Sequence, residues 1–582
     1  MTGDGFQIVE SVPRQRGLLV RVWNSLDPDR RTFALGYLVL LPLFLMPVFV
    51  TKFLPGLDLP FHLSIADMLM KADDPASPYA PYYESRLGFA PYAAHYLLLV
   101  GLGRFMVLAL AHNVVMGIYI AVLPLCCSYL LAVSGKSRLP ALLAFPLCFN
   151  MTLHYGFISF CLSLPALLLW LALTADLLAR PSLGIGWRAA RLPVLAGLVG
   201  CLLYLCHLQN YLFGICAVGA MCVLGPGGWR RRALGVAAIV PSALSLVLWW
   251  RRSPFTGDAA ARHGSFDFAW ETLKNARMAD LQWGQLPLRT DIENRIGWFP
   301  DHLLKGFVDL IDVRVANAIL FAAAFYYLLG WLGAWMGSGQ KRRTHFRLAH
   351  TMVFLGAVFA YFALPHHLRE FELMTFYPRF SVLAVLLFLP LIPAGLGRIS
   401  GFMRVGVMLP ALLIGVLWSH SLFIHYRAYR EEIADFAAVL RQTPADGKAV
   451  GIIYNRRSTV LRNESVLVGL TGFHVAARKS KTSMVPLAYC GMRHIPCAIK
   501  PNAPRLSHPG AWLEQPFEWP SLIDDFDVIY VRSSPYELLQ GHARDLQTVA
   551  HVGSWISLRK KPVRGRVHEK RDRQVARPDI AD

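Results

Sequence analysis

An aspartate and a histidine, four residues apart, follow the first long apolar run of the sequence. They are Asp58 and His62 in GLDLPFHLSIADML (56–69), directly after the apolar stretch 34–54. A carboxylate can act as a general base toward a hydroxyl group. A histidine one helical turn further on can orient that carboxylate or donate a hydrogen bond to a phosphate. The structural alternative is that Asp58 caps a helix whose first turn contains Pro60.

Three further interruptions of the apolar runs also carry histidine. They supply the pocket candidates His154, Tyr155, His207, Gln209 and Asn210, and the phosphate-binding candidates His366, His367, Arg369 and Arg379. Ionisable groups at membrane depth are energetically expensive and usually mark a site. Arginine is well suited to stabilising the charge of a departing phosphate.

Each of these residues also has a structural interpretation. A histidine at a helix end can cap the helix or lie at the membrane interface, and the arginines can snorkel or pair with Glu370 and Glu372. Four separate breaks that bring histidine to one side of a membrane favour a shared site. The first outer loop adds Asp67 and His95 on that same side.

The composition predicts the membrane. The 582 residues are 55% hydrophobic with a mean hydropathy of +0.41, and the apolar residues come in blocks long enough to cross a bilayer. No cleavable signal peptide precedes the first block, which we expect to anchor the chain. We predict about eleven spans, near residues 34–54, 110–133, 139–151, 155–178, 192–206, 209–225, 233–250, 313–337, 346–364, 379–397 and 403–424.

The loop charges predict the orientation. With a cytoplasmic N-terminus, every inner loop is basic and contains no acid, as in SGKSRL (134–139), GWRRR (228–232) and QKRRTHFR (340–347). The net charge of +21 is therefore topology information, and no nucleic-acid-binding module is indicated. An odd number of spans places everything after residue 424 outside the cytoplasm, which for a bacterial inner membrane is the periplasm.

The sequence divides into four parts. We expect a cytoplasmic tail (1–33), a multi-spanning membrane domain (34–424) with large outer loops at 55–109 and 251–312, an extracytoplasmic α/β domain (425–562) and a disordered charged tail (563–582). Strands are predicted for AVGIIY (449–454), FDVIYVRS (526–533) and SWISLR (554–559), with a helix between the last two in YELLQGHARDL (536–546).

Cysteine and histidine leave two questions open. Cys490 and Cys497 lie in the outer domain and form either a disulfide or two free thiols, whereas the other eight cysteines lie in or beside apolar spans. The histidines can bind a divalent metal, but no spacing is specific for metal ligands, so metal dependence stays undecided. The motifs of ATP hydrolysis and of Rossmann cofactors are absent.

The short motifs DLPFH, HYGFISFCLSLP (154–165) and YPRFSVLAVLLFLP (377–390), together with the long first outer loop, resemble the GT-C class of membrane glycosyltransferases. The resemblance implies an inverting transfer of a sugar from a polyprenyl-phosphate donor to a lipid, glycan or protein acceptor outside the cytoplasm, with Asp58 as the base. Two features depart from that class: no acidic doublet directly follows the first span, because Asp73 and Asp74 come later, and the outer domain has no WWD-type motif.

Two other functions remain open. A transporter of a lipid-linked glycan would have ionisable residues near mid-bilayer and internal repeats, which we do not find here. A non-catalytic partner in envelope glycan assembly or polymerisation would use the outer domain to bind glycan or protein. Replacing Asp58 separates these readings, because a general base is essential whereas a scaffold should tolerate asparagine.

Overall fold

The computed structural model describes residues 27–180, 187–252, 274–275, 277, 288–336, 346–367, 374–399, 402–463, 465–487, 490, 495–504, 506, 519–533 and 545–561. Some sequence predictions lie outside these ranges. They are most of the tail 1–33, much of the loop 251–312, Arg369, most of the helix at 536–546 and the tail 563–582.

Six helical segments are long and apolar enough to cross a membrane. They are α2 (Pro28–Val50), α5 (Leu108–Val133), α8 (Ile158–Ala179), the consecutive pair α11 (Trp229–Ala237) and α12 (Val240–Arg252), α15 (Ile311–Met336) and α18 (Phe402–Glu432). The first begins at a clear capping signal: the Asp27 side chain accepts a hydrogen bond from Arg30 N at 2.9 Å, and Pro28 occupies the first turn.

Shorter apolar elements occupy the other predicted spans. They are η1 (Leu139–Leu143), α6 (Ala144–Leu147), α7 (Met151–Tyr155), α9 (Trp187–Cys206), α10 (Leu208–Leu224), α16 (Arg347–Ala363), η5 (Tyr377–Arg379), α17 (Phe380–Phe388), η6 (Leu389–Leu391) and η7 (Ala394–Arg398). Each predicted apolar run therefore contains helix. The number of membrane crossings stays a prediction, because only six segments have the full length.

α8 lies at the centre of the bundle. Its apolar window is 89% buried, whereas that of residues 229–251 is only 17% buried. Exposed leucines and aromatic residues on the outer helices, such as Leu38 and Phe321, form the surface suited to face lipid. A helix that is apolar on all sides is expected in the interior of such a bundle.

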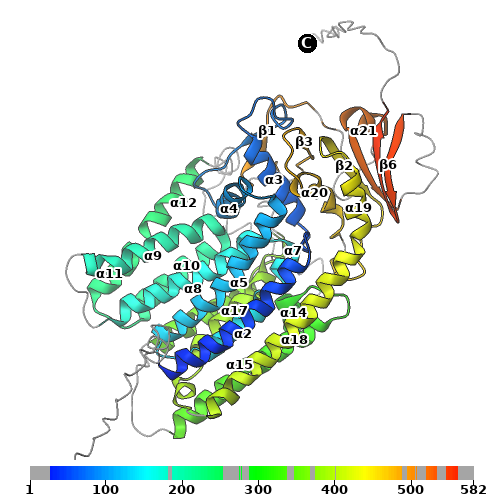
Figure 1. The fold of residues 1–582 in the computed structure, drawn as a ribbon. Coiled ribbons are helices and arrows are strands. Elements are labelled where there is room, and N and C mark those ends of the chain that lie inside the picture. The colour runs from blue at the N-terminus through cyan, green and yellow to red at the C-terminus, as the bar shows by residue number, and fades with distance from the viewer. Residues whose placement is uncertain are drawn as a thin grey trace, which may run out of the picture.

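One end of the bundle carries the non-spanning elements, and we call it the cap end. Figure 1 shows α3 (Leu59–Lys71), β1 (Tyr83–Ser85), α4 (Ala93–Gly103) and the C-terminal sheet together there, while α2 begins at the opposite end. The first predicted span ends earlier than expected, at Val50. Within the first predicted outer loop, α4 ends at Gly103. α14 (Leu288–Leu304), within the second predicted outer loop, leads to α15.

The C-terminal region is a small α/β unit built around a five-stranded sheet. Its elements are α19 (Ala434–Gln442), β2 (Gly447–Ile453), η8 (Val468–Gly472), α20 (Phe473–Ala476), β3 (Ser483–Met484), β4 (Cys497–Ile499), α21 (Trp519–Asp525), β5 (Val528–Arg532), β6 (Leu546–Val552) and β7 (Trp555–Lys560). The strand order is β3-β2-β5-β7-β6. β2 runs parallel to both β3 and β5, whereas β7 is antiparallel to β5 and to β6. The three predicted strands are thus present as β2, β5 and β7, and β3 and β6 are additions.

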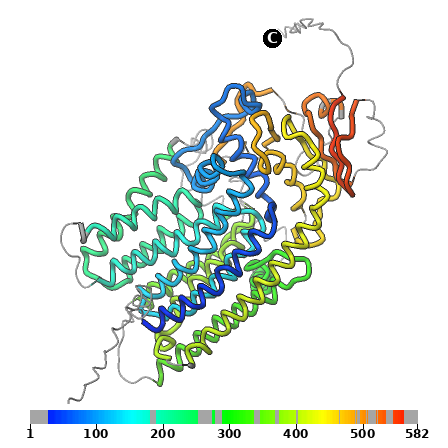
Figure 2. Tube along the Cα trace, viewed as in Figure 1, coloured from blue at the N-terminus to red at the C-terminus, as the bar shows by residue number. Residues whose placement is uncertain are grey.

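The chain enters this unit without a break. α18 continues past residue 424 to Glu432, and the Cα trace in Figure 2 follows it from the bundle into α19. A continuous helix couples the unit to the bundle more firmly than a flexible linker would.

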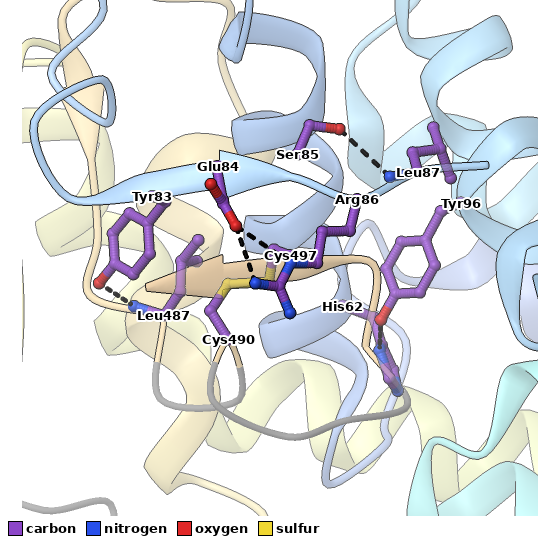
Figure 3. Close-up of a disulfide and its surroundings, with 10 residues drawn as sticks. All are labelled: His62, Tyr83, Glu84, Ser85, Arg86, Leu87, Tyr96, Leu487, Cys490 and Cys497. Atoms are coloured by element: carbon purple, nitrogen blue, oxygen red, sulfur yellow. Dashed lines mark hydrogen bonds and ion pairs between the residues drawn. A yellow bond between two sulfur atoms is a disulfide. The ribbon is translucent and has the colours of Figure 1, made fainter. Parts of the chain in front are cut away.

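The first outer loop and the C-terminal unit share a second, two-stranded sheet. β1 pairs antiparallel with β4, with Glu84 opposite Ala498 and Ser85 opposite Cys497. The Sγ atoms of Cys490 and Cys497 are bonded directly beside this ladder (Figure 3). Of the two states that the sequence left open for these cysteines, the structure therefore contains the disulfide. The bridge ties Cys490 to β4, the strand that pairs with β1.

A buried ion pair reinforces the same junction. Lys71 Nζ lies 2.7 Å from Asp67 Oδ2 on α3 and also donates to the Ser483 carbonyl at 3.0 Å. Burial raises the pKa of Asp67 to about 6, with Lys71 and the Tyr79 hydroxyl opposing the shift. The carboxyl group therefore binds its proton more tightly in the folded chain than in the unfolded one.

This pKa predicts how acid affects stability. Below the unfolded pKa both states are protonated, so the stabilisation from this proton is fully present; it is lost as the pH rises through about 6. Relative to Asp67→Asn, the detergent-solubilised wild type should gain about 2 kcal/mol of unfolding free energy between pH 7 and pH 4. Thermal unfolding across that range measures it, with the exposed Asp73→Asn as the matched control. Parallel curves for wild type and Asp67→Asn would contradict the prediction.

Candidate active site

Asp58 stands at the N-terminus of α3, at the cap end of the bundle. It occupies the N-cap position with Pro60 in the first turn, yet its side chain makes no capping hydrogen bond. The position agrees with the capping alternative, but the carboxylate is not used for capping.

The backbone around Asp58 is held by the turn after α7. Leu57 N donates to the His154 carbonyl at 3.2 Å, and Asp58 N donates to the Tyr155 carbonyl at 3.0 Å. Gly156 makes this possible: its φ is +87°, and a Cβ there would come within 2.8 Å of Asp58 N. Only glycine adopts this conformation without strain and leaves room for the neighbouring chain. Two of the predicted breaks therefore meet at Asp58.

Arg379 brings a buried cation to the same region. It ends η5, its side chain is almost completely buried, and its Nη2 donates to the Met374 carbonyl at 2.9 Å. Its guanidinium lies 4.1 Å from the centre of the Phe157 ring, a cation–π contact. Asp58 interacts with it electrostatically.

His207 connects Arg379 to the first outer loop. It is the N-cap residue of α10, and its Nε2 lies 3.2 Å from Arg379 Nη1. The Tyr92 ring meets the His207 ring edge-on at 4.9 Å. The Nε of Arg379 is buried and has no hydrogen-bond partner among the residues that the structure describes. An arginine held in place with a spare donor is suited to bind an anion.

His62 is oriented by the next helix. Its Nδ1 lies 2.7 Å from the Tyr96 hydroxyl, as Figure 3 shows, and its ring meets that of His95 edge-on at 5.5 Å. His95 in turn faces His112 at 6.2 Å. Burial, followed by His62 and His112, holds the pKa of His95 well below its ordinary value, so its imidazole is neutral at pH 7.

The remaining pocket candidates make contacts between helices. His154 Nδ1 lies 3.1 Å from the Lys305 carbonyl, and its Nε2 lies 3.4 Å from the Tyr426 hydroxyl. Gln209 donates to the Phe376 carbonyl at 3.3 Å, and Asn210 donates to Ser163 Oγ at 2.5 Å. These bonds give the side chains structural partners; their contact with a substrate stays a prediction.

The histidine pair before η5 lies beside a second buried arginine. His366 Nδ1 is 2.9 Å from His367 Nδ1, and the His366 ring packs against Tyr377 at 5.6 Å. The Arg295 guanidinium stacks on the ring of the same tyrosine, 3.7 Å from the ring centre. Burial, with smaller effects from His367 and the arginines, lowers the pKa of His366 to about 4. His366 therefore carries no positive charge at neutral pH, which weakens its predicted role as a phosphate partner.

Sequence reasoning assigned no role to several residues of this region. Tyr92 and Tyr96 lie four residues apart in the first outer loop, a helical spacing on either side of His95. His112 and Asn113 form a polar pair near the start of a long apolar helix, which is a signal in its own right. Arg295 gave no such signal, because α14 contains several other charged residues.

A metal site is not evident. Among the described residues, no group of three histidine, cysteine, aspartate or glutamate side chains is arranged to hold a metal ion. The described residues bring together the Asp58 carboxylate, the buried Arg379 and several imidazoles.

The fold and this site define a mostly helical membrane protein with a polar, buried cluster under a small C-terminal sheet unit. No protein-family model matches the chain, and no curated protein sequence matches it. Among solved structures, it is similar to the crystal structure of ArnT from Cupriavidus metallidurans bound to undecaprenyl phosphate. The identity is 12%, the match covers 90% of this chain and 97% of that chain, and the TM-score is 0.48. At this level of identity the similarity does not tell which residues act at a site.

Proposed function

We propose that the chain is a membrane glycosyltransferase that transfers a sugar from a polyprenyl-phosphate donor to a hydroxyl group of a lipid, glycan or protein on the extracytoplasmic face. The observation that carries the proposal is that Asp58 and Arg379 lie in the same region, close enough for their charges to interact. They come from distant parts of the membrane domain, yet they interact electrostatically at the cap end.

The two residues suit the two ends of a displacement reaction. The Asp58 carboxylate accepts the proton of the acceptor hydroxyl as its oxygen bonds to the anomeric carbon. The bond from that carbon to the phosphate oxygen breaks, and polyprenyl phosphate leaves with the electron pair. Arg379 stabilises the charge that develops on the phosphate. A single displacement of this kind inverts the anomeric carbon.

Other features support these roles. The Asp58 side chain makes no capping hydrogen bond to α3, so its position at the start of the helix does not by itself explain the carboxylate. His62 and His207 are each held by a neighbour, Tyr96 and Arg379 respectively, and can position the reacting groups. The resemblance of DLPFH to the GT-C class points to the same aspartate.

A transfer assay on the purified protein tests the proposal. The protein, in vesicles of phosphatidylethanolamine, is given a panel of polyprenyl-phosphate sugars, and the same sugars as nucleotide derivatives, with an envelope lipid extract as acceptor. We expect a glycosylated product and free polyprenyl phosphate with one lipid-linked donor and no product from nucleotide sugars alone. Product from nucleotide sugars alone, or no product from any lipid donor, would contradict the proposal and favour the scaffold or transporter readings.

A further inference from the structure

A basic cavity lies away from the Asp58 cluster, where the C-terminal unit joins the membrane helices. It measures about 250 Å³ and is lined by residues that follow α2, by the α18–α19 junction and by the end of α20. Four of its lining residues are cationic and none is acidic; the ten are Thr51, Lys52, Phe53, Arg430, Ile433, Ala437, Leu440, Arg441, Ala477 and Arg478. None of them belongs to the candidate active site.

Backbone contacts account for only part of this charge. Lys52 donates to the Ala477 carbonyl at 3.3 Å, Arg430 to the Val50 carbonyl at 3.1 Å, and Arg478 to the Thr443 carbonyl at 2.7 Å. Carbonyls near helix ends attract cations, so these bonds have a structural explanation. They use one donor of each side chain.

Arg478 keeps two donors that these contacts do not use. Its Nε and Nη2 atoms are buried and make no hydrogen bond of good geometry to the described residues, and the Tyr530 hydroxyl is the neutral group that interacts with this guanidinium. Asp446 interacts with Arg478 electrostatically but accepts hydrogen bonds from Ser480 and Thr482, at 2.5 and 2.8 Å. Buried guanidinium donors without acceptors are costly unless an anion binds them.

The cations also repel one another. Burial lowers the pKa of Lys52, and the charges of Arg478 and Arg441 lower it further. Like charges gathered in one cavity destabilise the chain unless a counterion is present. The cluster also lies at the cap end, where the positive-inside rule gives no reason for it.

The apolar surface beside the cavity indicates which kind of molecule would supply such an anion. Phe49 in the last turn of α2 and Ile424 on α18 are each about half exposed, at 51% and 50%, so apolar surface runs from the cavity along both helices. The cavity itself has apolar walls in Phe53, Ile433 and Leu440. An anion bound here would carry apolar groups that continue down these helices.

We propose that this cavity binds the negatively charged phosphodiester headgroup of a membrane lipid. The donors of Arg478, with Arg441 and Lys52, hold the phosphate, and the acyl chains lie along α2 and α18. The bound lipid fixes the C-terminal unit against the membrane helices. The site is independent of sugar transfer, because it shares no residue with the Asp58 cluster.

Lipid binding to the detergent-solubilised full-length protein tests this, with native mass spectrometry as the readout. We expect one phosphatidylglycerol to bind about tenfold more tightly than phosphatidylcholine. Arg441→Gln should weaken phosphatidylglycerol binding about tenfold, and Lys52→Gln/Arg441→Gln more. Neither variant should have a lower thermal midpoint without lipid, because both side chains are exposed and their removal relieves repulsion between cations. Arg427→Gln, which removes an exposed arginine of α18 that does not line the cavity, is the matched control and should bind normally.

Several results would overturn the proposal. Equal affinities for the two lipids would show that net charge is not recognised. An effect of Arg427→Gln as large as that of Arg441→Gln would show only a general charge effect. Displacement of phosphatidylglycerol by an equal concentration of inorganic phosphate would show a site for a free anion instead of a lipid.

Discussion

Asp58→Asn should abolish sugar transfer, lowering kcat by about 10³-fold, while donor binding and folding stay intact. Asparagine has nearly the same shape as aspartate but cannot accept the acceptor proton at neutral pH. Since the Asp58 side chain makes no capping bond, the change removes a charge without removing a cap of α3. Initial rates at saturating donor, with the thermal midpoint of each protein, measure the effect.

Matched variants separate catalysis from structure. Asp73→Asn removes an exposed carboxylate from the same outer loop and should leave the rate unchanged. Asp58→Glu keeps the base but displaces it by one methylene, so it should retain a small part of the activity. Full activity in Asp58→Asn would refute the base, and an equal loss in Asp58→Asn and Asp73→Asn would point to a general effect of loop charge.

The helical part of the fold could be predicted because its signal is local. A run of apolar residues specifies a buried or lipid-facing helix wherever it occurs, and helices lie in each predicted span. The mostly helical chain with several apolar spans and a C-terminal sheet unit is confirmed. Ends were less predictable: α2 stops at Val50, and residues 51–57 form a non-helical link to Asp58.

The weaker strands escaped prediction for a different reason. β6 buries only Leu546 and Ala550, so it lacks a strict alternation of buried and exposed residues, and its stability comes from its partner β7. β1 and β4 are three residues each. They form because they pair with each other, although most of the chain separates them in sequence. No local pattern encodes such a contact.

The candidate site was likewise predictable in its local features but not in its long-range contacts. The break pattern predicted that Asp58, His154 and His207 gather on one side, and the structure places them at the cap end. Which side chains meet depends on helix packing, so the contact of His207 with Arg379 could not be derived from spacing. The same packing gives His154 a partner in the Lys305 carbonyl, which the sequence could not indicate.

Arg379→Gln should lower kcat by about 10²- to 10³-fold with a smaller change in KM, because the charge on the leaving phosphate is fully developed only late in the reaction. Glutamine retains a donor of similar length but no positive charge. Arg379→Lys should keep more activity than Arg379→Gln, since it supplies the charge without the planar fork of donors. Rates with wild type and both variants at saturating donor measure the order.

Arg379→Gln removes both a charge and the packing contacts of the side chain, so further variants are needed to separate the two effects on the rate. Arg379 contacts His207, the Met374 carbonyl and the Phe157 ring, so its replacement also disturbs the cap end. His207→Gln removes one of these contacts and keeps the guanidinium; it should cost less than Arg379→Gln. The exposed Arg314→Gln, at the start of α15, controls for charge alone. If Arg379→Lys were as inactive as Arg379→Gln and His207→Gln matched both, Arg379 would act by organising the site and not by stabilising the phosphate.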